Sequence, residues 1–126
     1  MSFLKVDILR DPLPAIFDLV VCSEVLCFAE TQQELIEVCQ KIAAAVEPAG
    51  RVLLVNLRIA REHTSGWSAW DLAFGADSIH STFERVSGFK PRIEQWTDLY
   101  AISLFQKNSA DTDSINLCEL PENQKA

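Results

Sequence analysis

The chain has 126 residues, a length that accommodates one compact domain and not two. Apolar residue types make up 48% of it and charged types 23%, a globular composition that excludes a collagen-like repeat or a disulfide-dense miniprotein. The chain carries 11 Lys and Arg against 18 Asp and Glu, and the net charge of −7 argues against a nucleic-acid-binding surface, which needs clustered cations.

The sequence carries no pattern for export, membrane insertion or metal binding. The most apolar stretch, residues 17–28, is interrupted by acids and falls short of the roughly 20 apolar residues of a membrane span. Residues 1–7 lack the basic, apolar and small-residue regions of a signal peptide, so we expect a cytoplasmic protein. The four cysteines form no C-x-x-C pair, which predicts no structural metal, and Cys22 and Cys27 are interpreted as small buried hydrophobes.

The first elements in chain order are a strand and a helix. Residues 17–22 form a short, nearly unbroken apolar run, which is typical of a strand buried on both faces. Thr31 and Glu34 match a capping box, so a helix is expected to begin there. Pro48–Gly50 is expected to end it. The positions that recur at helical spacing and are expected to face inward are Leu35, Val38, Ile42, Ala45 and Val46.

The second half of the sequence predicts a further strand, a helix and a hairpin. Residues 51–57 form a second apolar run, and the strand, helix, strand order is the unit of a parallel sheet. After a long connection over residues 58–74, Asp77 is expected to cap a helix over 78–87 that ends at Gly88. Residues 90–96 and 99–106 predict an antiparallel hairpin. The predicted fold class is therefore α/β, with three parallel-type strands, a final strand that folds back antiparallel, and helices packed on the sheet.

The composition changes at about residue 108. Residues 108–126 contain no aromatic side chain and carry four acids against one Lys, a net charge of −3. Such a segment buries too little apolar area to offset its ordering entropy, so we expect a domain over residues 1–107 and a disordered acidic tail over 108–126. The alternative is that apolar side chains of this segment dock on a partner; these are Ile115, Leu117, Cys118 and Leu120.

Several segments together resemble the second half of a class I S-adenosylmethionine-dependent methyltransferase, with its Rossmann-like sheet. They are Asp7–Leu26, the capped helix, Glu47–Val55 and the closing hairpin. Residues Trp70–Ala76 resemble the nodulation-S-type branch, whose members N-methylate a chitooligosaccharide amine, although Leu72 and Ala73 replace the His and Pro of that branch. The resemblance covers roughly residues 3–107 and implies transfer of a methyl group to a small molecule or oligosaccharide.

The family features that bind the cofactor are missing from the sequence. The first strand of that fold ends in a glycine-rich turn, and an acid at the end of the second strand holds the ribose hydroxyls. This chain has four glycines and no G-x-G, and Met1 stands where the third strand of the full fold would be. We therefore expect a chain that is truncated and inactive alone: a remnant, a wrongly started or frameshifted reading frame, or one part of a protein assembled with a separately encoded half.

The resemblance implies roles for two pairs of residues in binding S-adenosylmethionine. Asp7 follows the third strand, where the family places an acid that accepts a hydrogen bond from the adenine amino group, and Ile8 offers a backbone N–H and apolar contact. The alternative for Asp7 is an Asx turn or a helix cap. Cys22 and Ser23 end the first clear strand, where their backbone carbonyls can face the methionine part of the cofactor.

The same resemblance implies one catalytic residue and a set of residues that contact the methyl acceptor. Glu24 lies at the carboxyl end of the strand and can orient an amine acceptor or act as general base, with a solvated loop acid or a helix-terminal charge as the alternative. Trp67, Trp70 and Asp71 are candidates for contact with a sugar acceptor, and the alternative is a packing lid. His80 is interpreted as a surface or capping residue.

Two functions from different classes follow. The chain is either a methyltransferase-like protein whose catalysis needs the cofactor-binding half, or a non-enzymatic remnant or interaction module that pairs through an exposed sheet edge. The strand over residues 17–22 is expected to be that edge, with Leu19 and Val21 uncovered, so self-association is expected.

Overall fold

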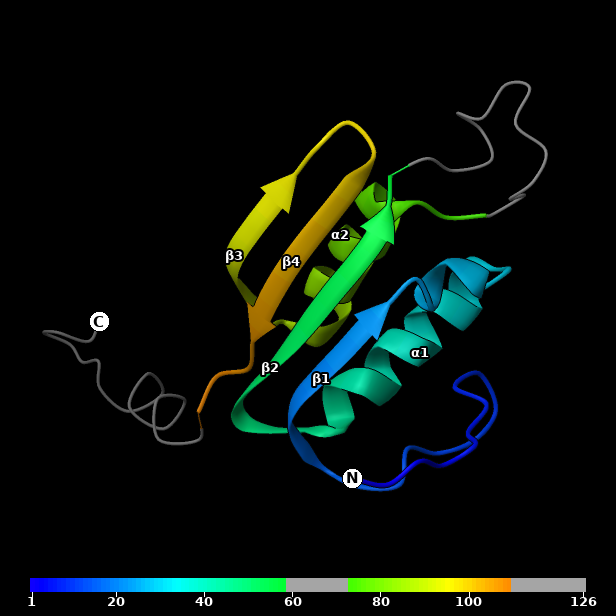
Figure 1. Cartoon of the computed structure of the whole chain (residues 1–126), viewed down its shortest axis with the longest axis vertical. Helices are drawn as coiled ribbons and strands as arrows, with labels where there is room; N and C mark the ends of the chain where they lie inside the picture. The colour runs from blue at the N-terminus through cyan, green and yellow to red at the C-terminus, as the bar shows by residue number, and fades with distance from the viewer. Residues whose placement is uncertain (59–72, 110–126) are drawn as a thin grey trace, which may run out of the picture.

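The computed structural model describes residues 1–58 and 73–109, which form one mixed four-stranded sheet and two α-helices (Figure 1). The elements in chain order are β1 (Phe17–Ser23), a short 3₁₀ helix η1 (Leu26–Phe28), α1 (Gln32–Ala44), β2 (Val46–Leu57), α2 (Ala76–Ser87), β3 (Lys90–Trp96) and β4 (Tyr100–Gln106). Among these described elements, neither helix combines the length and the apolar character needed to cross a bilayer.

The strand order in the sheet is β1-β2-β4-β3. β1 pairs parallel with β2, and β4 lies antiparallel between β2 and β3. β1, β2 and β3 therefore run in one direction and only β4 runs in the other, which confirms the predicted α/β class with its antiparallel C-terminal hairpin. β1 is an edge strand, as expected.

Both helices lie on the same face of the sheet (Figure 1). Side chains alternate between the two faces of a strand, and in β2 the buried positions Val52, Leu54 and Asn56 face the helices. The core between the sheet and the helices includes Leu35 and Ile42 of α1 and other fully buried side chains; the largest are Phe83, Phe105 and Leu26. The opposite face of the sheet has no helix on it among the described residues.

Helix α1 begins where the capping box predicts. Thr31 Oγ1 accepts a hydrogen bond from the Glu34 backbone N–H at 3.1 Å, and the Glu34 carboxylate accepts from the Glu30 N–H at 2.9 Å. The expected end at residues 48–50 is wrong, because the helix ends at Ala44. Val46 continues the helical spacing of apolar residues, but it pairs with Phe17 and begins β2. Sheet pairing therefore overrides the local pattern.

The start of β2 is irregular because β1 and β2 bulge against each other. Phe17 pairs with Val46 and Leu19 with Arg51, and between these pairs Ala49 adopts a left-handed φ of 67°. Gly50 follows in a crowded position, where a Cβ atom would lie 2.6 Å from Val46 Cγ1 and 2.8 Å from the Glu47 carbonyl oxygen. The glycine predicted to end a helix thus permits a close approach within the sheet.

Helix α2 differs from the prediction at its start. The cap residue is Gly75, and Asp77 lies in the first turn, where its carboxylate accepts a hydrogen bond from Arg58. The predicted end is confirmed: Gly88 adopts φ 74° and its N–H donates to the Glu84 carbonyl at 2.9 Å. The predicted inward residues Ile79 and Phe83 are buried.

Candidate functional site

The carboxyl ends of the parallel strands β1 and β2 lie side by side at one end of the sheet (Figure 1). Cys22 and Ser23 are the last residues of β1, and Glu24 follows them. The Glu24 N–H donates to the Val55 carbonyl of β2 at 2.9 Å. Cys22 is buried toward the helices and Ser23 is exposed. Sites in open α/β sheets form at this end, so the three residues predicted from the strand boundary lie at a suitable rim.

Glu24 combines two unusual features at this rim. Its φ of 57° lies in the left-handed region, which costs a residue with a Cβ of order 1 kcal/mol. Its Oε1 accepts a weak hydrogen bond from Cys27 Sγ at 3.8 Å, while Oε2 is buried and has no hydrogen-bond partner within the described part of the chain. A strained residue with an unsatisfied carboxylate oxygen is poorly explained by stability, and functional residues are often of this kind.

The cysteines around Glu24 are inert under ordinary conditions. Burial raises the pKa of Cys22 to about 11, and burial together with the Glu24 carboxylate raises that of Cys27 to about 11. Both thiols are therefore protonated at neutral pH and unsuited to nucleophilic chemistry. This agrees with the prediction that they act as small buried hydrophobes.

Asp7 forms a local turn at an exposed position. Its Oδ1 accepts from the Leu9 N–H at 3.0 Å and its Oδ2 from Arg10 Nη1 at 2.9 Å, and the hydrogen bond from Arg10 holds the pKa of Asp7 below its ordinary value. The turn is fixed to α1 because Lys41 Nζ donates to the Ile8 carbonyl at 2.8 Å. Both Asp7 oxygens are thus occupied within the Asx turn that was the alternative interpretation. An adenine-binding role for Asp7 and Ile8 stays a prediction.

The acceptor candidates Trp67, Trp70 and Asp71 lie outside the described residues. The two ends of the connection that carries them are joined by an ion pair, in which Arg58 Nε donates to Asp77 Oδ1 at 3.0 Å and Nη2 to Oδ2 at 3.2 Å. The Arg58 guanidinium also lies 5.1 Å from the centroid of the Trp96 ring. Arg58 therefore connects the end of β2 with α2 and with the end of β3.

His80, Asn56 and Ser103 form a buried polar cluster that the sequence did not predict. His80 Nδ1 lies 2.9 Å from Ser103 Oγ, and His80 Nε2 lies 3.0 Å from Asn56 Oδ1. Because Asn56 presents an oxygen, Nε2 carries the ring hydrogen and Nδ1 accepts from the serine hydroxyl. Burial lowers the pKa of His80 to about 4, so the ring is neutral at pH 7.

The interpretation of His80 as a surface or capping residue is wrong, since only 3% of it is exposed. Its spacing could have revealed this, because Ala76, His80 and Phe83 recur at helical spacing and all three are buried. Within residues 1–58 and 73–109, no group of three His, Cys, Asp or Glu side chains lies close enough together to hold a metal ion.

The strain at Glu24 leads to a first prediction. Replacing Glu24 by Gly is expected to raise the free energy of unfolding by about 0.5–1 kcal/mol relative to Glu24→Ala, because both variants lack the carboxylate but only Gly relieves the left-handed φ. Urea unfolding of the two variants measures the difference. A Gly variant less stable than the Ala variant would show that φ at residue 24 stores no strain.

Comparison with known proteins identifies the fold. No protein-family description and no curated protein matches the sequence. Solved structures do match: N-methyltransferase NodS from Bradyrhizobium japonicum WM9, in complex with S-adenosyl-L-homocysteine, has a TM-score of 0.63 and 18% identity over 81% of this chain and 52% of that chain. An O-methyltransferase family protein from Burkholderia thailandensis has a TM-score of 0.67 and 18% identity over 86% of this chain and 36% of that chain.

The cyclase SpnF matches as well, with a TM-score of 0.64 and 15% identity over 86% of this chain and 56% of that chain. The chain therefore has part of a methyltransferase-like α/β fold, and it spans between 36% and 56% of the length of these three proteins. Because a cyclase shares the fold, the fold by itself does not fix the reaction.

The residues of this chain fit only one side of a nucleotide-type cofactor site. Cys22–Glu24 offer a strand end, but no other strand of residues 1–58 and 73–109 pairs with the outer side of β1. The sequence also holds no G-x-G turn that would bring backbone N–H groups to the cofactor. No step of a methyl transfer is therefore assigned to the described residues.

Proposed function

We propose that this chain is the acceptor-side part of a methyltransferase-like domain, and that by itself it does not bind S-adenosylmethionine. The observation that carries the proposal is the sheet order β1-β2-β4-β3 with Glu24 at the rim of β1, in a fold similar to NodS. Cofactor binding would need further polypeptide beside β1 that brings a glycine-rich turn.

Within that proposal the rim residues have separate roles. Cys22 and Ser23 face the amino-acid part of the cofactor with their backbone, and Glu24 orients the acceptor or takes its proton. Asp7 and Ile8 contact the adenine, which requires the turn around Asp7 to release Arg10. Trp67, Trp70 and Asp71 contact a small-molecule or sugar acceptor.

Calorimetric titration of the purified chain with S-adenosylmethionine tests the proposal. We expect no heat of binding, because the sequence holds no G-x-G turn that would bring backbone N–H groups to the cofactor. The control is an intact enzyme of the same fold, such as NodS, under the same conditions. Saturable one-to-one binding by this chain would overturn the proposal.

A second function, that of an interaction module, is favoured by the edge strand β1. Leu19 and Val21 are 51% and 58% exposed. A groove of about 330 Å³ runs along this edge, with apolar side chains from the N-terminal segment, β1 and α1. An apolar open edge is suited to pairing with another strand. Analytical ultracentrifugation separates the cases, because a concentration-dependent mass favours the module and a monomer at all concentrations argues against self-pairing.

A further inference from the structure

Two buried side-chain atoms at the carboxyl ends of β1 and β2 have no hydrogen-bond partner among the residues that the structure describes. They are Glu24 Oε2 and Asn56 Nδ2. Ser23 and Val55 are the last residues that pair between the two strands, and Glu24 and Asn56 follow them directly. Buried polar atoms without a partner are costly and rare in folded proteins. Here one such atom is an acceptor and the other is a donor.

A chain of hydrogen bonds sets the direction of the Asn56 amide. The Ser103 hydroxyl donates to His80 Nδ1 at 2.9 Å, and His80 Nε2 donates to Asn56 Oδ1 at 3.0 Å. His80 therefore bridges β4 and β2, while β1 and Glu24 lie on the other side of β2. The oxygen and the nitrogen of a side-chain amide point in different directions, so Asn56 Nδ2 is directed away from His80 and keeps its capacity to donate.

The Glu24 carboxylate supplies the matching acceptor on the β1 side. Its Oε1 accepts from Cys27 Sγ at 3.8 Å, which leaves Oε2 without a donor. No hydrogen bond joins Glu24 directly to Asn56. A single group that donates to Glu24 and accepts from Asn56 would therefore satisfy both atoms.

We propose that Glu24 and Asn56 bind a hydroxyl group of the methyl acceptor, an identification of the ligand that rests on the function proposed above. A hydroxyl donates one hydrogen bond to Glu24 Oε2, accepts one from Asn56 Nδ2, and keeps a second lone pair free. A neutral amine has a single lone pair, which Asn56 would occupy. An ammonium ion has none and leaves Asn56 unpaired. The pair thus selects an alcohol or a sugar hydroxyl over an amine, because a buried polar atom left unpaired penalises the wrong ligand.

The ligand reaches this pair from the rim of the sheet. Glu24 is half-buried, and its neighbours Ser23 and Val25 are both exposed. Rotation of the Glu24 side chain opens the approach to its own Oε2 and to the more deeply buried Asn56, which is 1% exposed.

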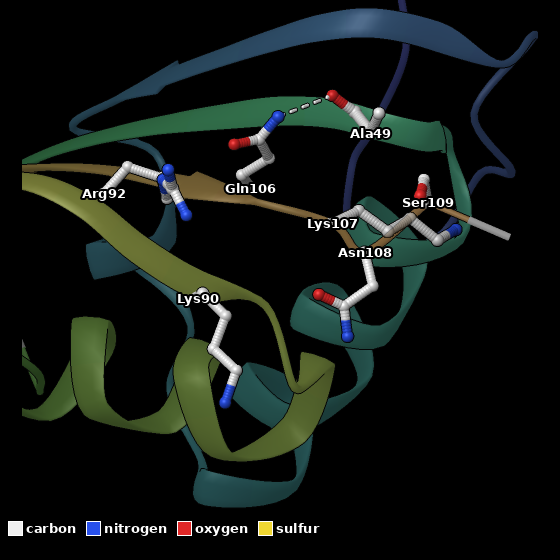
Figure 2. Close-up of a pocket in the computed structure, with 7 residues that line it drawn as sticks. All are labelled: Ala49, Lys90, Arg92, Gln106, Lys107, Asn108 and Ser109. Atoms are coloured by element: carbon white, nitrogen blue, oxygen red, sulfur yellow. Dashed lines mark hydrogen bonds between the residues drawn. The ribbon is translucent and has the colours of Figure 1, made fainter. Parts of the chain in front are cut away.

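The test uses the full chain with methanol as the hydroxyl probe. The side-chain NH₂ group of Asn56 and the carboxyl carbon of Glu24 are the NMR reporters. A ligand as small as methanol binds at best with a dissociation constant on the order of 10 mM, so the titration extends to about 1 M. We expect both reporters to shift along one saturating curve. The internal control is Gln106, whose Nε2 donates to the Ala49 carbonyl at 3.2 Å at the other end of the strands and should show no saturation (Figure 2).

Two further probes and two variants isolate the hydroxyl. Methylammonium donates without accepting and acetonitrile accepts without donating, so neither should shift the Asn56 NH₂ group saturably. Glu24→Ala should weaken methanol binding about tenfold or more, because the charged acceptor is lost. The matched control is Glu47→Ala, which removes an exposed carboxylate at the start of β2 and should leave methanol binding unchanged.

Three results would contradict the proposal. One is a His80 ring whose hydrogen is on Nδ1, as read from its nitrogen-15 shifts, because the Asn56 amide would then present an oxygen instead of a donor. Another is an Asn56 NH₂ group that fails to saturate in methanol or saturates equally in methylammonium. The third is equal methanol affinity in Glu24→Ala and the natural chain. None of these measurements involves the cofactor, so binding of S-adenosylmethionine by this chain would refute the proposed function alone.

Discussion

Replacing Phe83 by Ala is expected to lower the free energy of unfolding by about 3–5 kcal/mol. Phe83 is fully buried, and its ring centroid lies 5.0 Å from that of Phe105 in β4 and 5.4 Å from that of Phe89. It is therefore a principal contact between α2 and the sheet. The described residues form one hydrophobic core, which lies between the helices and one face of the sheet, and Phe83 is part of it. Urea unfolding followed by circular dichroism measures the change.

The control is Phe3→Ala, which removes the same atoms at a site that is 88% exposed and should change stability by less than about 0.5 kcal/mol. If Phe83→Ala does not fold, Phe83→Leu keeps most of the side-chain volume, so a smaller loss is expected and remains measurable. A loss below about 1 kcal/mol for Phe83→Ala would contradict the placement of α2 against β4.

The sequence was sufficient for the elements whose local and tertiary preferences agree. The apolar runs at β1 and β2, the capping box at Thr31 and the glycine after α2 all lie where the pattern predicts. Local pattern failed where another segment competes for the same residues. Val46 continues the helical spacing but pairs with Phe17, and Gly75 caps α2 while the Asp77 carboxylate binds Arg58.

The candidate site was predictable in position and not in conformation. The rule that sites lie at the carboxyl ends of parallel strands places Cys22–Glu24 correctly at a rim. The inward turn of the Glu24 carboxylate depends on its left-handed φ and on Cys27, neither of which a strand pattern contains. The identity of the sheet face that the helices cover was equally hidden, because the alternation of side chains along β2 does not say on which side the helices lie.

Acidification is expected to destabilise the protein through His80. The pKa of His80 in the folded protein is about 4, while an unfolded histidine titrates near 6.5. Above about pH 6.5 both states hold a neutral ring and the full stability is present. As the pH falls below that value, the unfolded state takes up a proton that the folded state does not. The free energy of unfolding should fall by about 2 kcal/mol between pH 7.5 and pH 5 from this residue alone.

The variant His80→Gln isolates this contribution, because it keeps a donor directed toward Asn56 and removes the titrating ring. Its stability at pH 7.5 should be lower than that of the natural chain, since the hydrogen bond with Ser103 is lost. Its stability should nevertheless depend less on pH between 7.5 and 5, and the carboxylates, which also titrate, are common to both proteins and cancel in the difference. Urea unfolding midpoints at several pH values provide the measurement. Equal pH slopes in the two proteins would mean that His80 is hydrated in the folded state, and the polar cluster with Asn56 and Ser103 would then not be a closed part of the core.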